Sequence, residues 1–329
     1  MTTVLNMTRL DIIAEITGAL SMAGFYTSEE SAVSNPLFDI VARRDSKLLL
    51  IKVLKNVDSM DQHRARMLKG VADILQATPL LVGVHTCSRA LDDGVVHVRH
   101  GITLITPNTM VEYLAEGDAP LVFSGHGGYY SRIDHEAMRE LRLAKGLSLS
   151  HLARELGVSV RTIQMYETGM CPSVDIAIGL EELLEGPVVQ PIDPFAAVSE
   201  DPDEDEAFDS TGGSDFHRAI YSLLSGMGYR IVPVMKCPFD AVGRGEKTAL
   251  IGGIRGGVPD EREMKKNARI ISSVSQISEV DGVFFVSRRI TTMSSTIEGI
   301  PVIGGNEVEG EVDEEDILEL IQKRKKENR

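Results

Sequence analysis

One short stretch of the chain places polar and basic side chains on a helix face where they could bond to base edges. Residues 159–168 read SVRTIQMYET. Ile163 and Tyr166 are three residues apart, so on a helix they share one face, which we expect to be buried. The other predicted free side chains of the stretch are Val160, Arg161, Thr162, Gln164 and Met165. Since an arginine guanidinium can bond O6 and N7 of guanine together, Arg161 is the predicted base reader.

The residues before this stretch predict two further helices that hold it in place. Asp134 is suited to cap the first helix, and Gly146 is suited to end it. The apolar side of this helix is expected to consist of Met138, Leu141 and Leu143. Ser148 begins the second helix. Its buried stripe is expected to be Leu149, Leu152, Ala153 and Leu156.

A tight turn at Gly157 and a cap at Ser159 then introduce the third helix, which is the stretch described first. A fourth short helix follows, so residues 134–185 are expected to form a four-helix module. A helix that enters the major groove reads base edges with the side chains near its N-terminus. The arrangement therefore predicts binding to double-stranded DNA through the third helix.

The module resembles the helix-turn-helix of the XRE family, the type found in Cro and the phage repressors. The matching motifs are Leu152-Ala153 in the second helix, Gly157-Val158-Ser159 in the turn and YETG at residues 166–169. The resemblance implies that Val160, Arg161 and Met165 face bases, and that Ser150, Thr162 and the backbone near Thr168 to Met170 meet phosphates. The full set of predicted DNA-binding residues is Ser148, Ser150, Ser159, Val160, Arg161, Thr162, Gln164, Met165 and Thr168.

The charge of the chain limits the affinity to be expected. The formal net charge is −15, from 34 Lys and Arg residues against 49 Asp and Glu residues, and residues 131–185 hold more acids than bases. Because affinity for DNA grows with the number of phosphates neutralised, one module should bind only modestly. Specific binding is therefore expected from a homodimer on an inverted repeat. If the module contacted proteins instead, the chain would be a non-catalytic interaction scaffold.

Composition divides the chain into four segments. Residues 187–213 combine prolines, many acids and few apolar residues, which is typical of a disordered linker. A shorter break, SGHGGYYS at residues 124–131, separates the first domain from the helical module. The predicted organisation is an α/β domain at 1–123, the XRE-type module at 132–186, an acidic linker at 187–213 and a second α/β domain at 214–329.

The two predicted α/β domains have similar sequences. DIIAEITGALSMAGF from Asp11 to Phe25 aligns without a gap on DFHRAIYSLLSGMGY from Asp215 to Tyr229. Each copy then has a Phe-Asp step, Phe38-Asp39 or Phe239-Asp240, followed further on by an apolar strand. Continuous apolar runs that alternate with helical segments predict a mixed or parallel sheet covered by helices. The expected fold class is α/β plus all-α, with the second α/β domain a duplicate of the first.

The Phe38-Asp39 step followed by LLLIK at residues 48–52 resembles a degenerate core of the restriction endonucleases and Holliday-junction resolvases. In that core a strand Asp precedes an acid-x-Lys triplet, and the two carboxylates hold a divalent metal while the Lys assists the attacking water. Here Leu50 replaces the acid, so most of the metal affinity should be lost. We therefore expect no catalytic residues, no metal and no other cofactor, with Asp39 satisfied by backbone groups and Lys52 solvated.

The second copy departs further, because Asp240 remains while Leu250 and Gly252 occupy the acid and Lys positions. The alternative function is a divalent-metal nuclease or resolvase-like enzyme, in which Asp39, Lys52 and Glu15 would carry the chemistry. A glycine-rich stretch at residues 243–248 lacks the glycine before the Lys that a phosphate-binding loop needs, so it predicts a hairpin turn.

Other features place the protein among soluble intracellular proteins. The three cysteines, Cys87, Cys171 and Cys237, are widely separated, so free thiols are expected rather than disulfides or a zinc site. The longest apolar runs are too short to span a membrane and the first residues lack a signal-peptide pattern, so we expect a cytoplasmic location and no membrane partner. The order of segments resembles a group of archaeal helix-turn-helix transcriptional regulators. This resemblance implies transcription regulation but names no operator and no effector.

Overall fold

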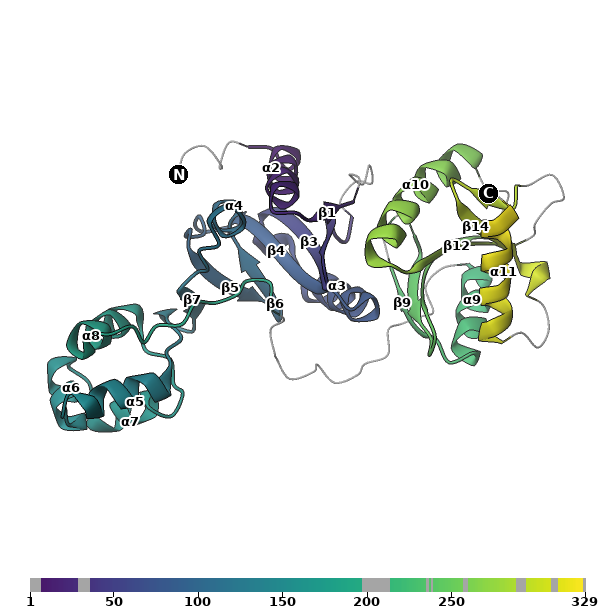
Figure 1. Ribbon diagram of the computed structural model, residues 1–329. Coiled ribbons are helices and arrows are strands. Elements are labelled where there is room, and N and C mark those ends of the chain that lie inside the picture. Colours follow the sequence, from purple (N-terminus) through teal and green to yellow (C-terminus); the bar gives the residue numbers. More distant parts are fainter. Residues whose placement is uncertain are drawn as a thin grey trace. The chain divides into compact units, whose positions relative to one another are not determined.

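The computed structural model describes residues 7–28, 36–196, 214–234, 237, 239–256, 260–287, 294–308 and 313–327 (Figure 1). The chain divides into two compact units. The first comprises residues 1–7, 54–58 and 81–196, and the second comprises residues 8–53, 59–80 and 197–329. Within the described residues, no helix is both long and apolar enough to cross a membrane.

The first sheet has eight strands in the order β1-β2-β3-β4-β6-β5-β7-β8. Their bounds are β1 Tyr26–Thr27, β2 Ile40–Arg44, β3 Lys47–Asn56, β4 Thr78–His85, β5 Val95–Arg99, β6 Ile102–Ile105, β7 Val122–Gly125 and β8 Gly128–Tyr130. The accompanying helices are α2 Arg9–Met22, α3 Gln62–Leu75 and α4 Pro107–Glu116, with a short 3-10 helix η1 at Val57–Ser59. β2 and β3 are antiparallel, with Ile40 opposite Ile51. Seven successive residues of β3 are buried, as expected of a strand covered on both faces.

Local signals explain where the first helices begin and end. Thr8 caps α2 in a capping box with Asp11, which satisfies amide groups at the start of the helix. Asp61 caps α3 by accepting from the backbone N–H of Arg64. α3 ends at Gln76, which adopts the left-handed conformation with φ 56°. Gln76 thus ends α3, and the carbonyl groups of the last turn lack partners within the helix.

The second sheet has six strands in the order β13-β14-β12-β11-β10-β9. Their bounds are β9 Arg230–Pro233, β10 Ala241–Arg244, β11 Ala249–Arg255, β12 Asp281–Val286, β13 Thr296–Ile297 and β14 Ile300–Gly304. β11, β12 and β14 run parallel, whereas β9, β10 and β13 pair antiparallel with their neighbours. The expectation of a mixed sheet is confirmed for this part of the chain.

Helices cover both faces of the second sheet. They are α9 Asp215–Gly226, α10 Glu261–Ser278 and α11 Glu314–Glu327, with a 3-10 helix η2 at Gly305–Glu307. α9 and α11 share one core with the sheet, to which they contribute Ile220 and Ile321. In Figure 1 the sheet lies between these two helices and α10. Beneath α10, Gly282 of β12 leaves room for the side chain of Ile271.

Four helices follow β8 and form the helical module. Their bounds are α5 His135–Ala144, α6 Leu149–Glu155, α7 Val160–Tyr166 and α8 Val174–Leu184. The buried residues of the module form one core, with Ile133, Met138, Leu152, Ala153, Ile163, Tyr166, Leu180, Leu184 and Val188. The module therefore has a hydrophobic centre of its own, as the spacing of its apolar residues predicts.

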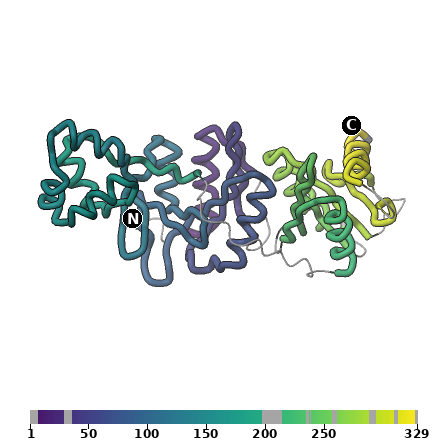
Figure 2. The backbone as a smooth tube through the Cα atoms, turned by 90° about the horizontal axis from the view of Figure 1, so that it is seen from below, coloured from purple at the N-terminus to yellow at the C-terminus, as the bar shows by residue number. Residues whose placement is uncertain are grey.

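Two segments that the sequence assigns to connections are structured. The predicted break at residues 124–131 contains the β7–β8 hairpin, in which Phe123 lies opposite Tyr130. Residues 187–196, predicted to begin the linker, run back from the helical module toward the sheet (Figure 2). The remainder of the predicted linker, residues 197–213, lies outside the described residues.

Burial of apolar side chains explains why residues 187–196 are held in place. Val188, Ile192 and Phe195 are all buried despite the prolines between them. The backbone N–H of Gln190 donates to the carbonyl of Arg132, and the N–H of Ile192 donates to the carbonyl of Pro120. The helical module is thus attached to the rest of its unit by an entering segment and a returning segment that bond to each other.

Candidate nucleic-acid interface

The third helix of the module, α7, has the exposed and buried faces that its sequence predicts. Ile163 and Tyr166 are 0% and 5% exposed, and both belong to the core of the module. Val160 and Met165 are 39% and 43% exposed. Arg161 and Gln164 are exposed beside them. α7 therefore presents a mixed apolar and hydrogen-bonding surface to solvent, of the kind that can contact bases.

The predicted serines cap the helices. Ser148 Oγ accepts from the backbone N–H of His151 at 3.0 Å, at the start of α6. Ser159 Oγ accepts from the N–H of Thr162 at 3.0 Å, and it also lies 2.8 Å from Thr162 Oγ1. Ser150 is exposed on α6. Ser148, Ser159 and Thr162 thus have structural partners, so any phosphate contact would add to their capping role or replace it.

Thr168 caps carbonyl groups at the C-terminal end of α7. Its hydroxyl donates to the carbonyl of Gln164 at 3.1 Å and to that of Met165 at 3.0 Å. The side chain is therefore turned back on the helix, although the residue itself is exposed. Gly157, between α6 and α7, has φ +65°, so the tight turn depends on a residue that tolerates the left-handed region.

A buried ion pair links the first helix of the module to the end of α7. Arg142 Nε and Nη2 donate to the two carboxylate oxygens of Glu167 at 2.6 and 3.1 Å. Arg142 Nη1 also donates to the carbonyl of Leu147 at 3.1 Å. The two charged side chains are only 9% and 11% exposed. This bidentate contact joins α5 to the C-terminal end of α7.

The expected apolar side of the first helix is wrong at one position. Leu143 is 58% exposed, whereas its neighbour Arg142 is buried. By hydropathy alone, Arg142 is expected to face solvent and Leu143 to be buried. Arg142 is buried because Glu167, 25 residues away, neutralises it. The second residue of the YETG motif is the signal that could have identified this pair.

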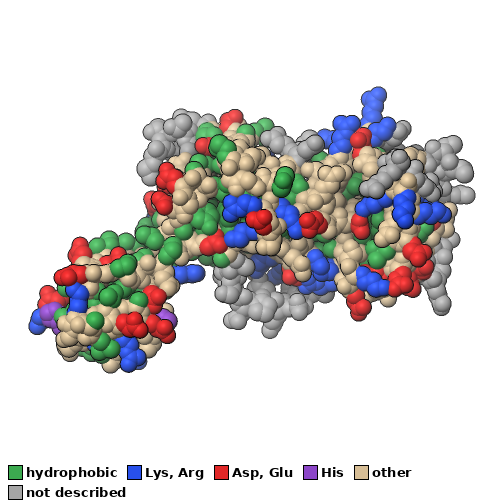
Figure 3. Space-filling view, in the orientation of Figure 1, with side chains coloured by type: hydrophobic (Ala, Val, Ile, Leu, Met, Phe, Trp, Pro, Cys, Tyr) green, Lys and Arg blue, Asp and Glu red, His purple; other side chains and the backbone are tan. Residues whose placement is uncertain are grey.

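Acidic and basic side chains alternate on the visible face of the helical module, at the lower left of Figure 3. Arg154, for example, pairs with Glu155 at 2.7 Å, and both side chains are well exposed. The module thus shows no single broad basic patch on this face. This distribution agrees with the modest affinity per module that its excess of acids predicts.

The nuclease-like centre of the first α/β domain is a buried cluster of charges around Asp39. Asp39 is 5% exposed, and its Oδ2 accepts from the backbone N–H of Val53 at 2.7 Å. Arg9 forms an ion pair with the other carboxylate oxygen. Lys52 Nζ lies 3.5 Å from Asp39 Oδ2 and donates to the carbonyl of Pro36. The expected backbone partner of Asp39 is present, and two cations surround the same carboxylate.

Lys52 is not solvated, which corrects the expectation from the sequence. It is 1% exposed and is among the largest fully buried side chains of the described residues. Burial lowers the pKa of Lys52 to about 8, and the nearby cations Arg9 and Arg64 lower it as well, while Asp39 acts in the opposite direction. A local sequence in which Lys52 follows four apolar residues contains the signal for this burial, since β3 is covered on both faces.

Asp240 in the second α/β domain has a similar set of partners. Its Oδ2 accepts from the backbone N–H of Ile254 and from Arg255 Nη1, each at 2.6 Å. His217 Nε2 lies 3.7 Å from Oδ1. In both domains, therefore, the strand aspartate bonds to the backbone N–H fourteen residues later and pairs with an arginine.

The residues around these aspartates do not fit a divalent metal. Leu50, in the place of the second acid of the first domain, is fully buried. Glu15 is exposed on α2, whereas Asp39 is buried and already neutralised. Across the described residues there is no group of three His, Cys, Asp or Glu side chains that could hold a metal ion. A hard cation needs several oxygen ligands, whereas Asp39 and Asp240 each have an arginine as neighbour.

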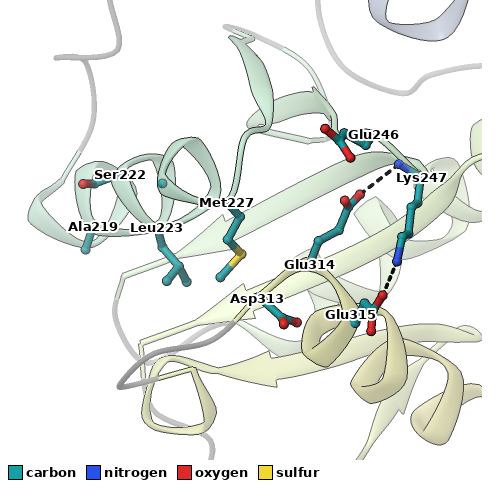
Figure 4. A pocket seen from close by; sticks show the side chains of 10 residues that line it. Ala219, Ser222, Leu223, Met227, Glu246, Lys247, Asp313, Glu314 and Glu315 are labelled. Carbon is teal, nitrogen blue, oxygen red and sulfur yellow. Dashed lines mark hydrogen bonds and ion pairs between the residues drawn. The ribbon is translucent and has the colours of Figure 1, made fainter.

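The glycine-rich stretch of the second domain is a hairpin turn, as predicted. The N–H of Gly245 donates to the carbonyl of Thr248 at 2.9 Å, between the antiparallel strands β10 and β11. Lys247 pairs with Glu315, and its backbone N–H donates to Glu314 at 3.3 Å (Figure 4). The surface hollow beside Lys247 has four acids among its lining residues, Glu246, Asp313, Glu314 and Glu315, so it does not suit a phosphate group.

Comparison with known proteins identifies two of the segments. Residues 9–120 match the family of PD-(D/E)XK superfamily domains, and residues 138–189 match the helix-turn-helix family. A "Putative HTH-type transcriptional regulatory protein" of Halorubrum lacusprofundi is 34% identical over 322 residues, covering 97% of this chain and 98% of that protein. A similarly named protein of Pyrococcus furiosus is 35% identical over 308 residues, covering 92% and 94%. The likeness therefore extends through both α/β domains and the helical module.

The Arg142–Glu167 pair should control the stability of the helical module. Glu167→Ala leaves the Arg142 charge buried without its partner, which typically costs about 3–5 kcal/mol. Hydrogen exchange of the intact chain should therefore accelerate strongly in α5 and α7, and less in Glu167→Gln, which keeps an acceptor oxygen. Glu155→Ala is the matched control, because it removes an exposed pair with Arg154. Equal exchange in both alanine variants would contradict this role.

The lowered pKa of Lys52 should be measurable directly. In the folded chain the group loses its proton near pH 8, whereas an ordinary lysine does so near 10.5. Between these values the unfolded state holds more protons, so the contribution of Lys52 to stability should increase with pH, by about 3 kcal/mol in full. An NMR titration of carbon-labelled lysine side chains should show one signal that titrates near pH 8 and is absent from Lys52→Met. Ordinary titration of every lysine would exclude the buried environment.

Proposed function

Because this chain belongs to the family of archaeal proteins named "Putative HTH-type transcriptional regulatory protein", we propose that it is a transcriptional regulator that reads a specific DNA sequence in the major groove with α7. The observation that carries the proposal is the exposed surface of Val160, Arg161, Gln164 and Met165 on a short helix whose opposite face is buried. A surface of this kind at the end of a compact helical module is suited to enter a groove.

Each exposed side chain of α7 has a defined part in this proposal. Arg161, near the N-terminus of the helix, would bond to O6 and N7 of a guanine. Val160 and Met165 would pack against thymine methyl groups, and Gln164 would bond to an adjacent base. Ser150 and the backbone near Thr168 would position the module on phosphates. Their exposure permits these contacts, and the contacts themselves are the proposal.

The proposed DNA-bound form is a homodimer. A single α7 covers only one half-site, and the excess of acids in the module weakens the binding of one copy. Two copies joined by two-fold symmetry would read an inverted repeat whose half-sites lie about one helical turn, or a multiple of it, apart. This arrangement supplies the affinity that one acidic chain lacks.

We further propose that the chain is not a nuclease, although one of its domains belongs to the PD-(D/E)XK superfamily. Arg9 and Arg255 neutralise the two strand aspartates, and Leu50 replaces the second acid. An arginine side chain provides the positive charge in place of a metal but offers no Lewis-acid site and no bound water. The α/β domains would then serve to support and pair the DNA-reading modules.

Selection of bound sequences from random duplex DNA tests the reading of bases. The native chain should enrich an inverted repeat, and Arg161→Ala should lose the preference at one base pair of each half-site, by about 1–3 kcal/mol. Arg139→Ala is the matched control, because it removes the same charge from an exposed position on α5. Its base preferences should equal those of the native chain at the same salt concentration.

Two results would count against the proposal. If neither the native chain nor the variants enrich any sequence, the helical module does not read bases and the interaction-scaffold interpretation gains support. If the native chain enriches a single half-site and has a monomeric mass in solution, it acts without a dimer.

Incubation with supercoiled and branched DNA in the presence of magnesium or manganese tests the absence of nuclease activity. We expect no cleavage above background, and we expect Asp39→Ala to behave as the native chain does. Metal-dependent cleavage that Asp39→Ala abolishes would show that the centre is catalytic in spite of its arginine.

A further inference from the structure

Two arginines of the second compact unit make reciprocal contacts between the α/β domains. Arg43, on β2 of the first domain, donates from Nη1 to the carbonyl of Ile277 at 3.2 Å, at the C-terminal end of α10. Arg244, on β10 of the second domain, donates from Nε to the carbonyl of Ile74 at 2.6 Å, at the C-terminal end of α3. Each domain thus provides an arginine for the final turn of a helix in the other.

These four residues occupy matching positions in the two domains. Arg43 and Arg244 each lie four residues after the strand aspartate, Asp39 or Asp240. Ile74 and Ile277 each lie two residues before a left-handed helix cap, formed by Gln76 and Glu279, and both caps have φ 56°. Arg43 also pairs with Glu279 at 2.6 Å. The same interaction is therefore made twice, once in each direction.

A third contact joins two residues that hold the same position in the two domains. Phe38 and Phe239 each precede the strand aspartate, and their ring centroids lie 6.0 Å apart. The two side chains are 7% and 1% exposed. In a two-fold symmetric interface, residues on the axis contact their own equivalents, while residues away from it contact in reciprocal pairs. Phe38 and Phe239 contact as residues on the axis do, and Arg43 and Arg244 make the reciprocal contacts.

We propose that the two nuclease-like domains form a pseudo-two-fold pair within one chain, held by Arg43 and Arg244 and centred on Phe38 and Phe239. The carbonyl groups of a final helical turn lack partners in the helix, and the helix dipole makes this end negative. An arginine satisfies these groups with both its N–H donors and its charge. α10 contacts β2 and α3 contacts β10, as such a pair requires.

The pairing occurs within one chain because the connection favours it. Residues 197–213 can span up to about 60 Å when extended, so they permit the two domains of one chain to meet. A tether of this length also gives the two domains an effective concentration of the order of millimolar, which a second chain would have to match.

The consequence concerns how two chains can meet on DNA. The face around Phe38 and Phe239 is occupied within each chain, so it cannot also join two chains. The proposed homodimer must therefore form through a different surface. This inference depends only on contacts between the α/β domains, so failure of DNA binding would leave it intact.

Crosslinking of the full-length chain tests the pair. Asp73 and Arg230 form an ion pair between the same two domains, and both side chains are well exposed, so cysteine should be tolerated at both positions. The variant Asp73→Cys/Arg230→Cys, with the exposed Cys87 changed to Ser, would be treated with a short bismaleimide. We expect rapid crosslinking, a monomeric mass on a denaturing gel, and a joined peptide that contains both new cysteines.

A mixture of the two single-cysteine variants separates pairing within a chain from exchange between chains. It should give no crosslinked dimer beyond the level of either variant alone. A strong dimer band from the mixture would show that the domains pair between chains and would overturn the proposal. Absence of crosslinking in the double-cysteine chain would overturn the pairing itself.

Loss of the arginines tests their role. In the double-cysteine chain, Arg43→Ala/Arg244→Ala should slow crosslinking about tenfold or more, because two charged hydrogen bonds to helix ends are lost. Arg44→Ala is the control, since Arg44 donates to the carbonyl of Ala23 at 2.9 Å and lies over the Phe25 ring, both in its own domain. Thermal unfolding of each variant confirms that its domains are folded. Equal crosslinking rates in folded variants would show that the arginines do not hold the pair.

Discussion

A charge held largely out of water needs an opposite charge beside it, and at three places in this chain an arginine pairs with a carboxylate. Arg9 pairs with Asp39, Arg255 with Asp240 and Arg142 with Glu167. In the α/β domains the arginine pairs with the aspartate that precedes β2 or β10. In the helical module it joins α5 to the end of α7. The same interaction thus occurs at both nuclease-like centres and at the end of the proposed DNA-reading helix.

Local patterns in the sequence were sufficient to predict the helical module. The spacing of Ile163 and Tyr166 identified the buried face of α7, and Ser148 and Ser159 marked the starts of α6 and α7. The errors concern residues whose environment depends on distant partners. Arg142 is neutralised by a residue 25 positions away, and Lys52 lies in a strand covered on both faces, beside Asp39. Periodicity compares only neighbouring residues, so the apolar run before Lys52 indicates a covered strand but does not identify the distant side chain that pairs with a buried charge.

The attachment of the helical module to its unit also could not be read from composition. Residues 187–196 contain three prolines and resemble a linker, but Val188, Ile192 and Phe195 are buried. Phe195 packs edge-on against Tyr113 of α4 with ring centroids 5.1 Å apart, and the Tyr113 hydroxyl donates to Asp193 at 3.0 Å. Burial of apolar side chains outweighs the low overall hydropathy of the segment. An entering and a returning segment, bonded to each other, therefore connect the module to the part of the chain that carries α4.

This attachment gives the α/β domains a mechanical part in the proposed reading of DNA. A dimer reads two half-sites only if its two recognition helices are held at a defined separation, and a module on a flexible tether would accept many separations. Because the module is attached at two points, the domain that carries α4 would have to set the separation of the two recognition helices. If Phe38 and Phe239 close the α/β pair within each chain, the surface that sets the separation lies elsewhere on the protein. The nuclease-like fold would then act as a rigid support, which explains how it could persist without the carboxylates of an active site.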